Sequence, residues 1–346
     1  MADSPPAAAP RRRPVAFRSL RISLGRAPIW LVVFGIEGLL ALAPALIARV
    51  WLHGAVEHRY PPGSLFSNLD QNFRFDWRQD KATLDEAMGM LGSVLAAIAV
   101  LFGAFSAGGW LQVFLERTQG HSLQRFFLGG ARYFWRFLRL AVVTVLVLCA
   151  LTWIVHGPGW NRIVLRGLLH VPANDVEKLE TFTSEWSVVL LRWSQQAIYA
   201  VGFGLVLVWG DYARTRLALH DTASAVWSGI CTAFTMLRHP LRTLRPVAAL
   251  FALEVLVVVA AGLLARRVEE VVSTGSGLGG VGLLLAISLF ALLWRIVLRG
   301  ARYHAAVQVS REVVRPIARP DPWKESLGPE GGPRYPIGGD EYGMSL

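Results

Sequence analysis

Long apolar stretches alternate with shorter polar segments along the chain. A helix that crosses the hydrocarbon core of a bilayer, about 30 Å thick, needs about 20 mainly apolar residues. Six stretches reach this length, and no polar segment between them has the pattern of a soluble domain. The sequence therefore predicts an all-α fold, a polytopic transmembrane helix bundle with six spans. The predicted spans are Pro28–Leu52, Ala87–Leu115, Leu140–Trp160, Val188–Gly210, Pro246–Ala265 and Val271–Trp294.

The composition supports a membrane protein and argues against a nucleic-acid-binding protein. Of the 346 residues, 53% are hydrophobic and the mean hydropathy is +0.42, which would leave a soluble chain with too much exposed apolar surface. The formal net charge is +11. The basic residues flank the predicted spans, where membrane topology already accounts for them, so we expect no nucleic-acid partner.

The basic residues also set the predicted orientation. With the N-terminus placed inside, 24 of the 35 lysines and arginines fall on the inner side, 10 fall on the outer side when Arg49 at the outer end of the first span is included, and Arg192 lies within a span. Cytoplasmic loops carry the excess of basic residues in multi-pass membrane proteins. The predicted topology is therefore N-in/C-in, with both termini in the cytoplasm.

The two ends of the chain are expected to carry no domain of their own. Residues 1–26 are basic and begin with a segment rich in proline and alanine, which predicts a disordered cytoplasmic N-terminus. Residues 316–346 are rich in glycine and proline and lack periodicity, which predicts a flexible cytoplasmic tail. The predicted transmembrane domain occupies residues 27–315.

One inner segment, Ser122–Arg139, combines a basic face with an aromatic face. Its four arginines are seven, four and three residues apart, which places them on one side of a helix. Phenylalanines occupy much of the remaining surface. We expect this amphipathic helix to lie in the cytoplasmic interface and to contact anionic lipid headgroups or a protein partner. The arginines are Arg125, Arg132, Arg136 and Arg139.

The arginine spacing recurs before a later span. Arg132–Arg139 and Arg238–Arg245 share the motif R-x-x-x-R-x-L-R, each ahead of a predicted span. One interpretation is a parallel internal repeat of a span, a short amphipathic helix and a second span. The other is that inner helix ends generally carry arginines on one face. Both interpretations stay open. The candidate lipid or partner face also includes Arg238, Arg242 and Arg245.

Two acidic residues fall inside predicted spans. Glu37 and Glu254 each lie about nine residues from the inner end of a span, and therefore about 14 Å deep at 1.5 Å per residue. A charged carboxylate at this depth avoids lipid, so it is protonated, paired or directed into a wet cavity. The functional interpretation is a proton- or cation-binding site, and the structural interpretation is hydrogen bonding between helices.

The fourth predicted span contains a polar patch near its outer end. Arg192 is followed closely by Gln195 and Gln196. Arg192 is expected to extend toward the outer interface, and the two glutamines are expected to bond neighbouring helices. Together with Glu37 and Glu254, these three residues make up the candidate intramembrane polar site.

No motif for catalysis, a metal or a cofactor stands out in the sequence. His53 and His58 are five residues apart and cannot share one helical face, and there is no cysteine and histidine ligand cluster. The Gly-x-Ser-x-Gly motif, the P-loop and the dinucleotide fingerprint are also missing. We therefore expect no enzyme activity and no cofactor.

Two inner segments, Gly130–Arg136 and Asp211–Leu217, resemble those of uncharacterised bacterial six-helix integral membrane proteins. The layout is also similar to the membrane domain attached to some glycerophosphodiester phosphodiesterases. The resemblance covers roughly Arg26 to Val314. It implies a multi-pass protein of the bacterial cytoplasmic (inner) membrane and no established activity. No phosphodiesterase chemistry carries over, because these 346 residues contain no such domain.

The leading functional hypothesis is a non-enzymatic integral membrane protein with an assembly, partner-binding or membrane-organising role. Its working surface would be the arginine-rich cytoplasmic face, and its partners would be the anionic headgroups of the lipid bilayer and a protein partner or second copy of the chain. The alternative is a small permease or channel with proton or cation coupling through Glu37 and Glu254. A cavity shared by these two glutamates would favour the alternative.

Overall fold

The computed structural model describes most of the chain. The described residues are 14–56, 71–116, 121–171, 184–220, 224–272 and 277–313. They all belong to the first of two units into which the chain divides, Met1–Val313 and Val314–Leu346. The predicted flexible tail at 316–346 and the first 13 residues of the predicted disordered N-terminus lie outside the described residues.

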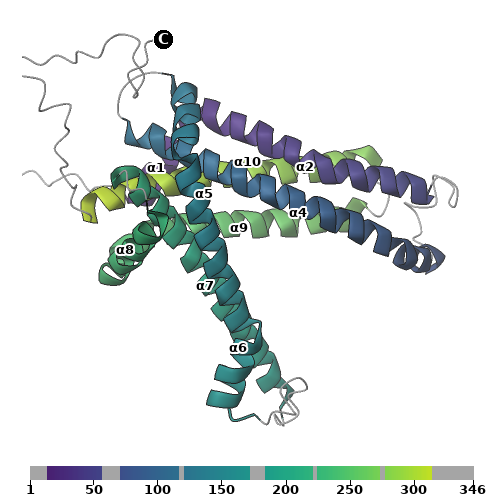
Figure 1. Ribbon diagram of the computed structural model, residues 1–346. Coiled ribbons are helices and arrows are strands. Elements are labelled where there is room, and N and C mark those ends of the chain that lie inside the picture. The colour runs from purple at the N-terminus through teal and green to yellow at the C-terminus, as the bar shows by residue number, and fades with distance from the viewer. Residues whose placement is uncertain are drawn as a thin grey trace, which may run out of the picture. The chain divides into compact units, whose positions relative to one another are not determined.

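Every regular element among the described residues is a helix (Figure 1). Six of these helices are long, with 30 to 45 residues each. The long helices are α2 (Ala27–Val56), α4 (Gln71–Leu115), α5 (Ser122–Val155), α7 (Glu185–His220), α9 (Pro240–Val272) and α10 (Gly277–Val313). The short elements are α1 (Val15–Leu24), α6 (Pro158–Trp160), the π-helix η1 (Asn161–Leu168) and α8 (Ala225–Arg238).

Five of the six predicted spans are confirmed, within the part of the chain that the structure describes, as helices long and apolar enough to cross a membrane. They are α2, α4, α5, α9 and α10. The remaining one, Val188–Gly210, forms part of α7, which is long enough at 36 residues. Arg192 and the polar residues after it lower the hydropathy of this helix, so α7 stays a predicted span.

The third predicted span ends earlier than expected. α5 stops at Val155 rather than Trp160. His156 caps the helix, and Gly157 and Pro158 follow it. Proline cannot continue the hydrogen-bond ladder of a preceding helix and disfavours helical geometry in the residue before it, which explains the break.

The boundary between the last two spans also moves. The predicted loop at 266–270 is helical, because α9 continues to Val272 and α10 begins at Gly277. Arginine and glutamate are good helix formers and sustain the helix through this segment. The junction between the two helices therefore falls after Val272, later than predicted.

Helix α1 corrects the prediction that residues 1–26 are disordered, because residues 15–24 are helical. α1 packs against α10, and its residues Ser19 and Ser23 are fully buried. The Ser23 hydroxyl donates a hydrogen bond to the backbone oxygen of Val297, at 2.7 Å. These contacts with a distant helix stabilise the segment, and composition alone does not reveal them.

The segment Ser122–Arg139 is not a separate interfacial helix, so that prediction is wrong. It is the first part of α5, which continues into the apolar span without a break. Phe126 and Phe137 are buried in the core rather than exposed to lipid. A Cβ atom on Gly108 of α4 would lie 2.6 Å from the backbone oxygen of Gly129. Glycines on both helices thus allow α4 to approach α5 closely and cover its aromatic face.

Helix α8 does have the predicted pattern of a short amphipathic helix. The side chain of Ser224 caps it by accepting a hydrogen bond from the backbone of Trp227. On the buried side, the Ser228 hydroxyl donates a hydrogen bond to the backbone oxygen of Ala213 in α7, at 3.2 Å. The opposite side is apolar and exposed, as expected for a helix in a lipid interface. Its exposed residues include Val226, Ile230, Phe234 and Leu237.

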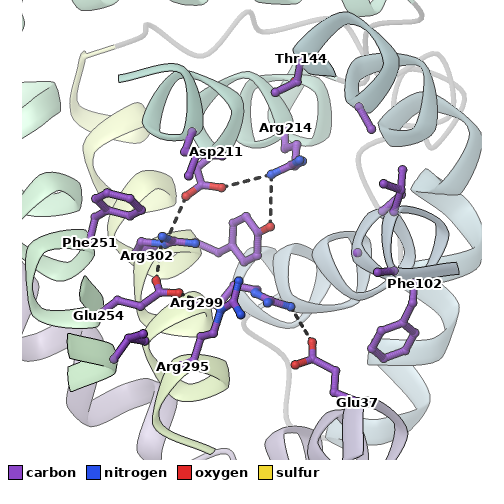
Figure 2. Close-up of a pocket in the computed structure, with 18 of the residues that line it drawn as sticks. Glu37, Phe102, Thr144, Asp211, Arg214, Phe251, Glu254, Arg295, Arg299 and Arg302 are labelled. Carbon is purple, nitrogen blue, oxygen red and sulfur yellow. Dashed lines mark hydrogen bonds and ion pairs between the residues drawn. The ribbon is translucent and has the colours of Figure 1, made fainter. Parts of the chain in front are cut away.

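The long helices pack against one another in pairs. α4 packs against α5, α9 against α10, and α5 against α7. α10 also contacts α1, α2, α4 and α7. Through these contacts, α10 meets helices from the beginning and from the middle of the chain. They also enclose a cavity, whose charged lining is drawn in Figure 2.

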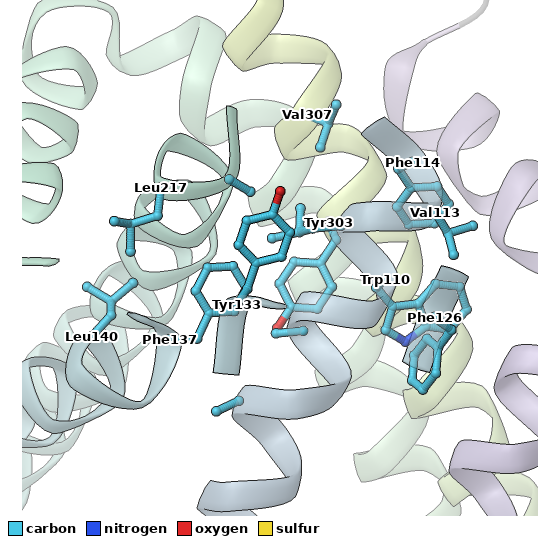
Figure 3. Packing of buried hydrophobic residues seen from close by; sticks show 14 of the residues in the cluster. Trp110, Val113, Phe114, Phe126, Tyr133, Phe137, Leu140, Leu217, Tyr303 and Val307 are labelled. Atoms are coloured by element: carbon cyan, nitrogen blue, oxygen red, sulfur yellow. The ribbon is translucent and has the colours of Figure 1, made fainter. Parts of the chain in front are cut away.

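A hydrophobic core joins α4, α5, α7 and α10 beside this cavity (Figure 3). Trp110 of α4 stacks on Phe114, with ring centroids 5.5 Å apart, and meets Phe126 of α5 edge-on at 6.3 Å. Tyr303 of α10 lies in the same cluster. Aromatic pairs of this geometry stabilise beyond the area they bury, so they strengthen the contact between α4 and α5.

Buried positions recur along α5 and α9 at a spacing of 110 residues. The arginine motif recurs at 106 residues, because it aligns Arg136 with Arg242. The two spacings differ by four residues, about one helical turn, so the alignment that matches the arginine motif does not match the buried positions. With the spacing of 110 residues, four buried positions on α5 correspond to buried positions on α9. The buried pairs are Tyr133 and Thr243, Phe137 and Val247, Leu140 and Leu250, and Thr144 and Glu254.

Candidate functional site

A cavity of about 840 Å³ lies between helices α2, α4, α5, α7, α9 and α10. Part of its lining is charged and most of the remainder is apolar. The charged side chains come from α2, α7, α9 and α10, and Figure 2 shows them directed toward one another. We call this set the charged cluster. It consists of Glu37, Asp211, Arg214, Glu254, Arg295, Arg299 and Arg302.

Helix α10 supplies three of the four arginines. Arg295, Arg299 and Arg302 follow the apolar part of this helix and are four and three residues apart. Residues at these spacings lie on one face of a helix. α10 packs against α2, α7 and α9, the helices that carry the three carboxylates. One arginine face therefore meets acids from three separate helices.

Glu37 of α2 is paired with Arg299. Arg299 Nη1 donates a hydrogen bond to Glu37 Oε1 at 2.7 Å, and both side chains are largely buried. A bond of this length between ionised groups is a strong, charge-assisted one. The pair compensates the charge of a carboxylate that an apolar helix would otherwise not tolerate.

Glu254 of α9 is shared by two arginines. Arg302 Nη1 lies 2.8 Å from Glu254 Oε2, and Arg295 Nε lies 3.3 Å from Glu254 Oε1. The side chains of Glu254 and Arg302 are each 10% exposed, whereas that of Arg295 is 55% exposed. Arg295 is therefore the most open arginine of the charged cluster.

Asp211 connects α7 to the same cluster. Arg302 Nε lies 3.4 Å from Asp211 Oδ2, and Arg214 Nη1 donates to Asp211 Oδ1 at 3.2 Å. Arg214 Nη1 also donates to the hydroxyl of Tyr303, at 3.4 Å. An arginine side chain does not lose its proton in proteins. Arg214 thus remains a cation.

The charged cluster has an excess of positive charge. Four arginines face three carboxylates, which leaves one positive charge uncompensated within the described lining of the cavity. Arg302 Nε and Glu254 Oε2 are buried and, among the described residues, take part in ion pairs without aligned hydrogen bonds. Glu254 Oε2 can only accept hydrogen bonds, so the excess arginine charge is what favours an anion at this cluster.

The remaining lining of the cavity is mainly apolar. α9 contributes Val255, Val258 and Val259, and α4 contributes Val100 and Gly103. A Cβ atom on Gly103 would meet no other atom within 4 Å. This glycine borders open space, and a larger side chain at this position would extend into the cavity.

The structure brings together two of the five residues of the predicted intramembrane polar site. Glu37 and Glu254 line the same cavity, as the permease hypothesis requires. Their partners are arginines, however, so each carboxylate is held in an ion pair. Of the three alternatives for a carboxylate in a span, two are observed together, because both glutamates are paired and both line the cavity.

The other three residues of that predicted site lie elsewhere on α7. Gln195 Nε2 donates a hydrogen bond to the backbone oxygen of Val155 in α5, at 2.6 Å. This bond between helices is the role predicted for the glutamines. Arg192 and Gln196 are exposed, and neither lines the cavity.

The predicted arginine face is largely, but not wholly, exposed. Arg125 is withdrawn from it, because Arg125 Nε lies 3.5 Å from Glu116 Oε2 and only 15% of its side chain is exposed. Arg136 is partly buried. The exposed members are Arg132, Arg139, Arg238, Arg242 and Arg245.

Most of the charged cluster was not expected from the sequence. The three arginines of α10 fall among the basic residues that flank the predicted spans, and Asp211 and Arg214 fall within a segment noted for its resemblance. One signal was present in the spacing. Asp211 and Arg214 are three residues apart, and the α10 arginines are four and three apart, so each group shares a helical face.

Within the described ranges, no group of three or more histidine, cysteine, aspartate or glutamate side chains is placed to hold a metal ion. No protein-family model, curated protein or solved structure matches the chain. The cavity and its charged cluster are therefore the basis on which function can be inferred.

Proposed function

We propose that this chain is a multi-pass protein of the bacterial cytoplasmic membrane that binds a ligand in the cavity between its helices. It has six spans, including α7, and both termini are cytoplasmic. It acts as a binding protein or carrier rather than as an enzyme. The observation that carries this proposal is the meeting of seven charged side chains from four helices on one cavity.

The energetic cost of the charged cluster supports a functional role. Ionisable residues inside a membrane protein are costly to bury, and they mark ligand or ion pathways more often than they add stability. Apolar side chains at these seven positions would pack the bundle at lower cost. A pocket of several hundred cubic ångströms with convergent polar groups is also the usual form of a ligand site.

The pairing of the carboxylates distinguishes this proposal from a simple proton carrier. Glu37 and Glu254 each lie within 3.3 Å of an arginine nitrogen, so both carboxylates are already engaged in ion pairs. The excess positive charge instead favours an anionic ligand.

Thiol labelling tests whether the cavity is accessible. In a background with Cys149→Ser and Cys231→Ser, we would introduce Leu207→Cys, at a position that lines the cavity, or Leu217→Cys, which is on the same helix but fully buried. A negatively charged methanethiosulfonate reagent should label Leu207→Cys much faster than Leu217→Cys. Gly103→Leu should slow the labelling of Leu207→Cys, because its side chain extends into the cavity.

The same labelling can contradict the proposal. If Leu207→Cys reacts as slowly as Leu217→Cys, the cavity does not admit an anion. A labelling rate unaffected by Gly103→Leu would show that the reagent arrives by another route, and the cavity would lose its proposed function.

A second candidate function is membrane organisation through the cytoplasmic face. The observation in its favour is the exposed apolar side of α8, which ends beside the exposed residues Arg238, Arg242 and Arg245. An apolar surface next to arginines matches a helix that lies among anionic headgroups. This function does not need the cavity, so the two candidates can be tested separately.

Enrichment of acidic lipid around the protein tests this second candidate. The triple variant Arg238→Gln, Arg242→Gln and Arg245→Gln should recruit less fluorescent phosphatidylglycerol in mixed vesicles than the unmodified protein. The matched control is neutralisation of Arg162 and Arg166 on η1, which lies on the predicted outer side. Equal recruitment by all three proteins would remove this candidate.

A further inference from the structure

We infer that the ligand of the cavity is an acidic amphiphile, with a phosphate-class headgroup bound at Arg295 and an apolar chain lying along α9. This inference rests on the proposed function and names its ligand class. It follows from three properties of the cavity, which are its excess charge, the order of its lining residues and its opening.

The headgroup end is defined by Arg295. Its side chain is more than half exposed, whereas its partner Glu254 is mostly buried and is also held by Arg302. A ligand phosphate could therefore approach Arg295 without displacing Glu254 from Arg302. Arginine presents paired N–H donors that match phosphate oxygens, so a phosphate group suits this position well.

The lining residues change from charged to apolar in the same order on four helices. An apolar residue that also lines the cavity lies three or four residues after the charged residue on α2 and α9, and three or four residues before it on α7 and α10. Three or four residues correspond to about 5–6 Å along a helix axis. The charged members are held level with one another by their ion pairs. The residue pairs are Glu37 and Leu40 on α2, Asp211 and Leu207 on α7, Glu254 and Val258 on α9, and Arg295 and Leu292 on α10.

This order gives the cavity one charged end and one apolar end. A small hydrophilic anion would contact only the charged end and would leave the apolar walls covered by water. An amphiphile satisfies both ends, because its headgroup meets the arginines and its chain covers the valines. The cavity volume of about 840 Å³ is also within the range that accommodates a ligand with more than a headgroup.

The apolar end is open. Val255, Val258 and Val259 of α9 line the cavity, yet each is about half exposed, and Val100 on α4 is 41% exposed. A closed pocket for a small solute would bury these side chains. An open apolar wall within a membrane protein lets an acyl chain extend from the cavity into the surrounding lipid.

The test uses the full-length protein purified in a neutral detergent, with its thermal unfolding followed by intrinsic fluorescence. Three additives would be compared: a short-chain phosphatidic acid, inorganic phosphate, and a phosphatidylcholine with the same chains. A ligand that binds only the folded state raises the unfolding midpoint as its concentration exceeds the dissociation constant. We expect phosphatidic acid to raise the midpoint by several degrees, and the other two additives to have little effect.

Two variants connect the effect to the cavity. Arg295→Gln should weaken the apparent affinity for phosphatidic acid about tenfold or more, since a charge-assisted contact is lost. Arg295 is largely exposed, so this variant should fold normally. Arg162→Gln is the matched control, because Arg162 is an exposed arginine on η1 that does not line the cavity. It should retain the full shift.

Each remaining outcome overturns the inference in a distinct way. An equal shift with inorganic phosphate would identify a simple anion site, which overturns the amphiphile but keeps the proposed binding function. An equal shift with phosphatidylcholine, or a shift retained by Arg295→Gln, would remove the headgroup assignment. No shift with phosphatidic acid would overturn the ligand class, while rapid labelling of Leu207→Cys would still support an accessible cavity.

Discussion

Glu37 of α2 and Arg299 of α10 are 262 residues apart in the chain, and their side chains are joined by a hydrogen bond of 2.7 Å. The pair links a helix near the start of the chain to the last described helix. It also places a carboxylate at the edge of the cavity without leaving its charge uncompensated. The hydrogen bond between these two residues predicts a coupling between their contributions to the free energy of unfolding, which can be measured.

Removing both members of this pair should cost less than the two single removals added together. Glu37→Gln or Arg299→Gln alone should lower the free energy of unfolding by about 1.5–3 kcal/mol, because a charge-assisted hydrogen bond is lost. The double variant should cost less than the sum of the two single variants, since neither charge is then left unpaired. Unfolding in mixed micelles measures all four proteins of this cycle. Strictly additive losses would mean that the two groups do not interact.

Asp211→Asn should be among the most destabilising changes in α7. Asp211 is 3% exposed and has ion pairs with Arg214 and Arg302. Losing its charge leaves two largely buried arginines with less compensation, at a cost of about 3–5 kcal/mol. Glu185→Gln, at an exposed acid in the first turn of α7, is the control and should change stability by less than about 1 kcal/mol. Comparable losses for the two variants would argue against a cluster at Asp211.

Gly108→Ala should separate α4 from α5. The new Cβ atom would lie 2.6 Å from the backbone oxygen of Gly129, and a backbone atom cannot move aside as a side chain can. We expect overpacking to lower the free energy of unfolding by about 1–3 kcal/mol. Gly92→Ala on the same helix meets no atom within 4 Å and should be neutral or slightly stabilising. Gly108→Ala with unchanged stability would contradict the close approach of the two helices.

The crossing by α7 can be tested with reporters. With 36 residues, α7 is about 54 Å long, which exceeds the thickness of the hydrocarbon core. If both α5 and α7 cross the membrane, reporters fused after Glu116 and after His220 should be on the same, cytoplasmic side. A reporter after His220 that is active only in the periplasm would show that α7 does not cross, and the six-span topology would then be wrong.

The sequence predicted the membrane helices well because their signal is strong and local. Twenty apolar residues in a row have few alternatives to a spanning helix, so five predicted spans were confirmed as suitable helices. α7 is the exception because Arg192 and the glutamines after it lower the mean hydropathy of the helix. Predictions at the ends of helices were weaker, since α1 and the first part of α5 are ordered by contacts with distant helices.

Only part of the candidate site could be predicted from the sequence. Glu37 and Glu254 could be found because a lone acid in an apolar span is unusual, and their similar depth suggested a shared site. Their arginine partners were hidden among basic residues that membrane topology already explains. Asp211 sits just beyond an apolar span and has no unusual neighbours in sequence. Only the packing of α10 against α2, α7 and α9 shows that these residues meet.

The retention of lipid by the purified protein tests most directly whether the cavity is a ligand site. Native mass spectrometry would count acidic phospholipids bound to the unmodified protein and to Gly103→Leu, whose added side chain occupies the cavity. Gly92→Leu is the control, because Gly92 also faces open space but does not line the cavity. We predict that the unmodified protein and Gly92→Leu retain an acidic phospholipid and that Gly103→Leu loses it. Equal retention by all three proteins would contradict a ligand site in this cavity.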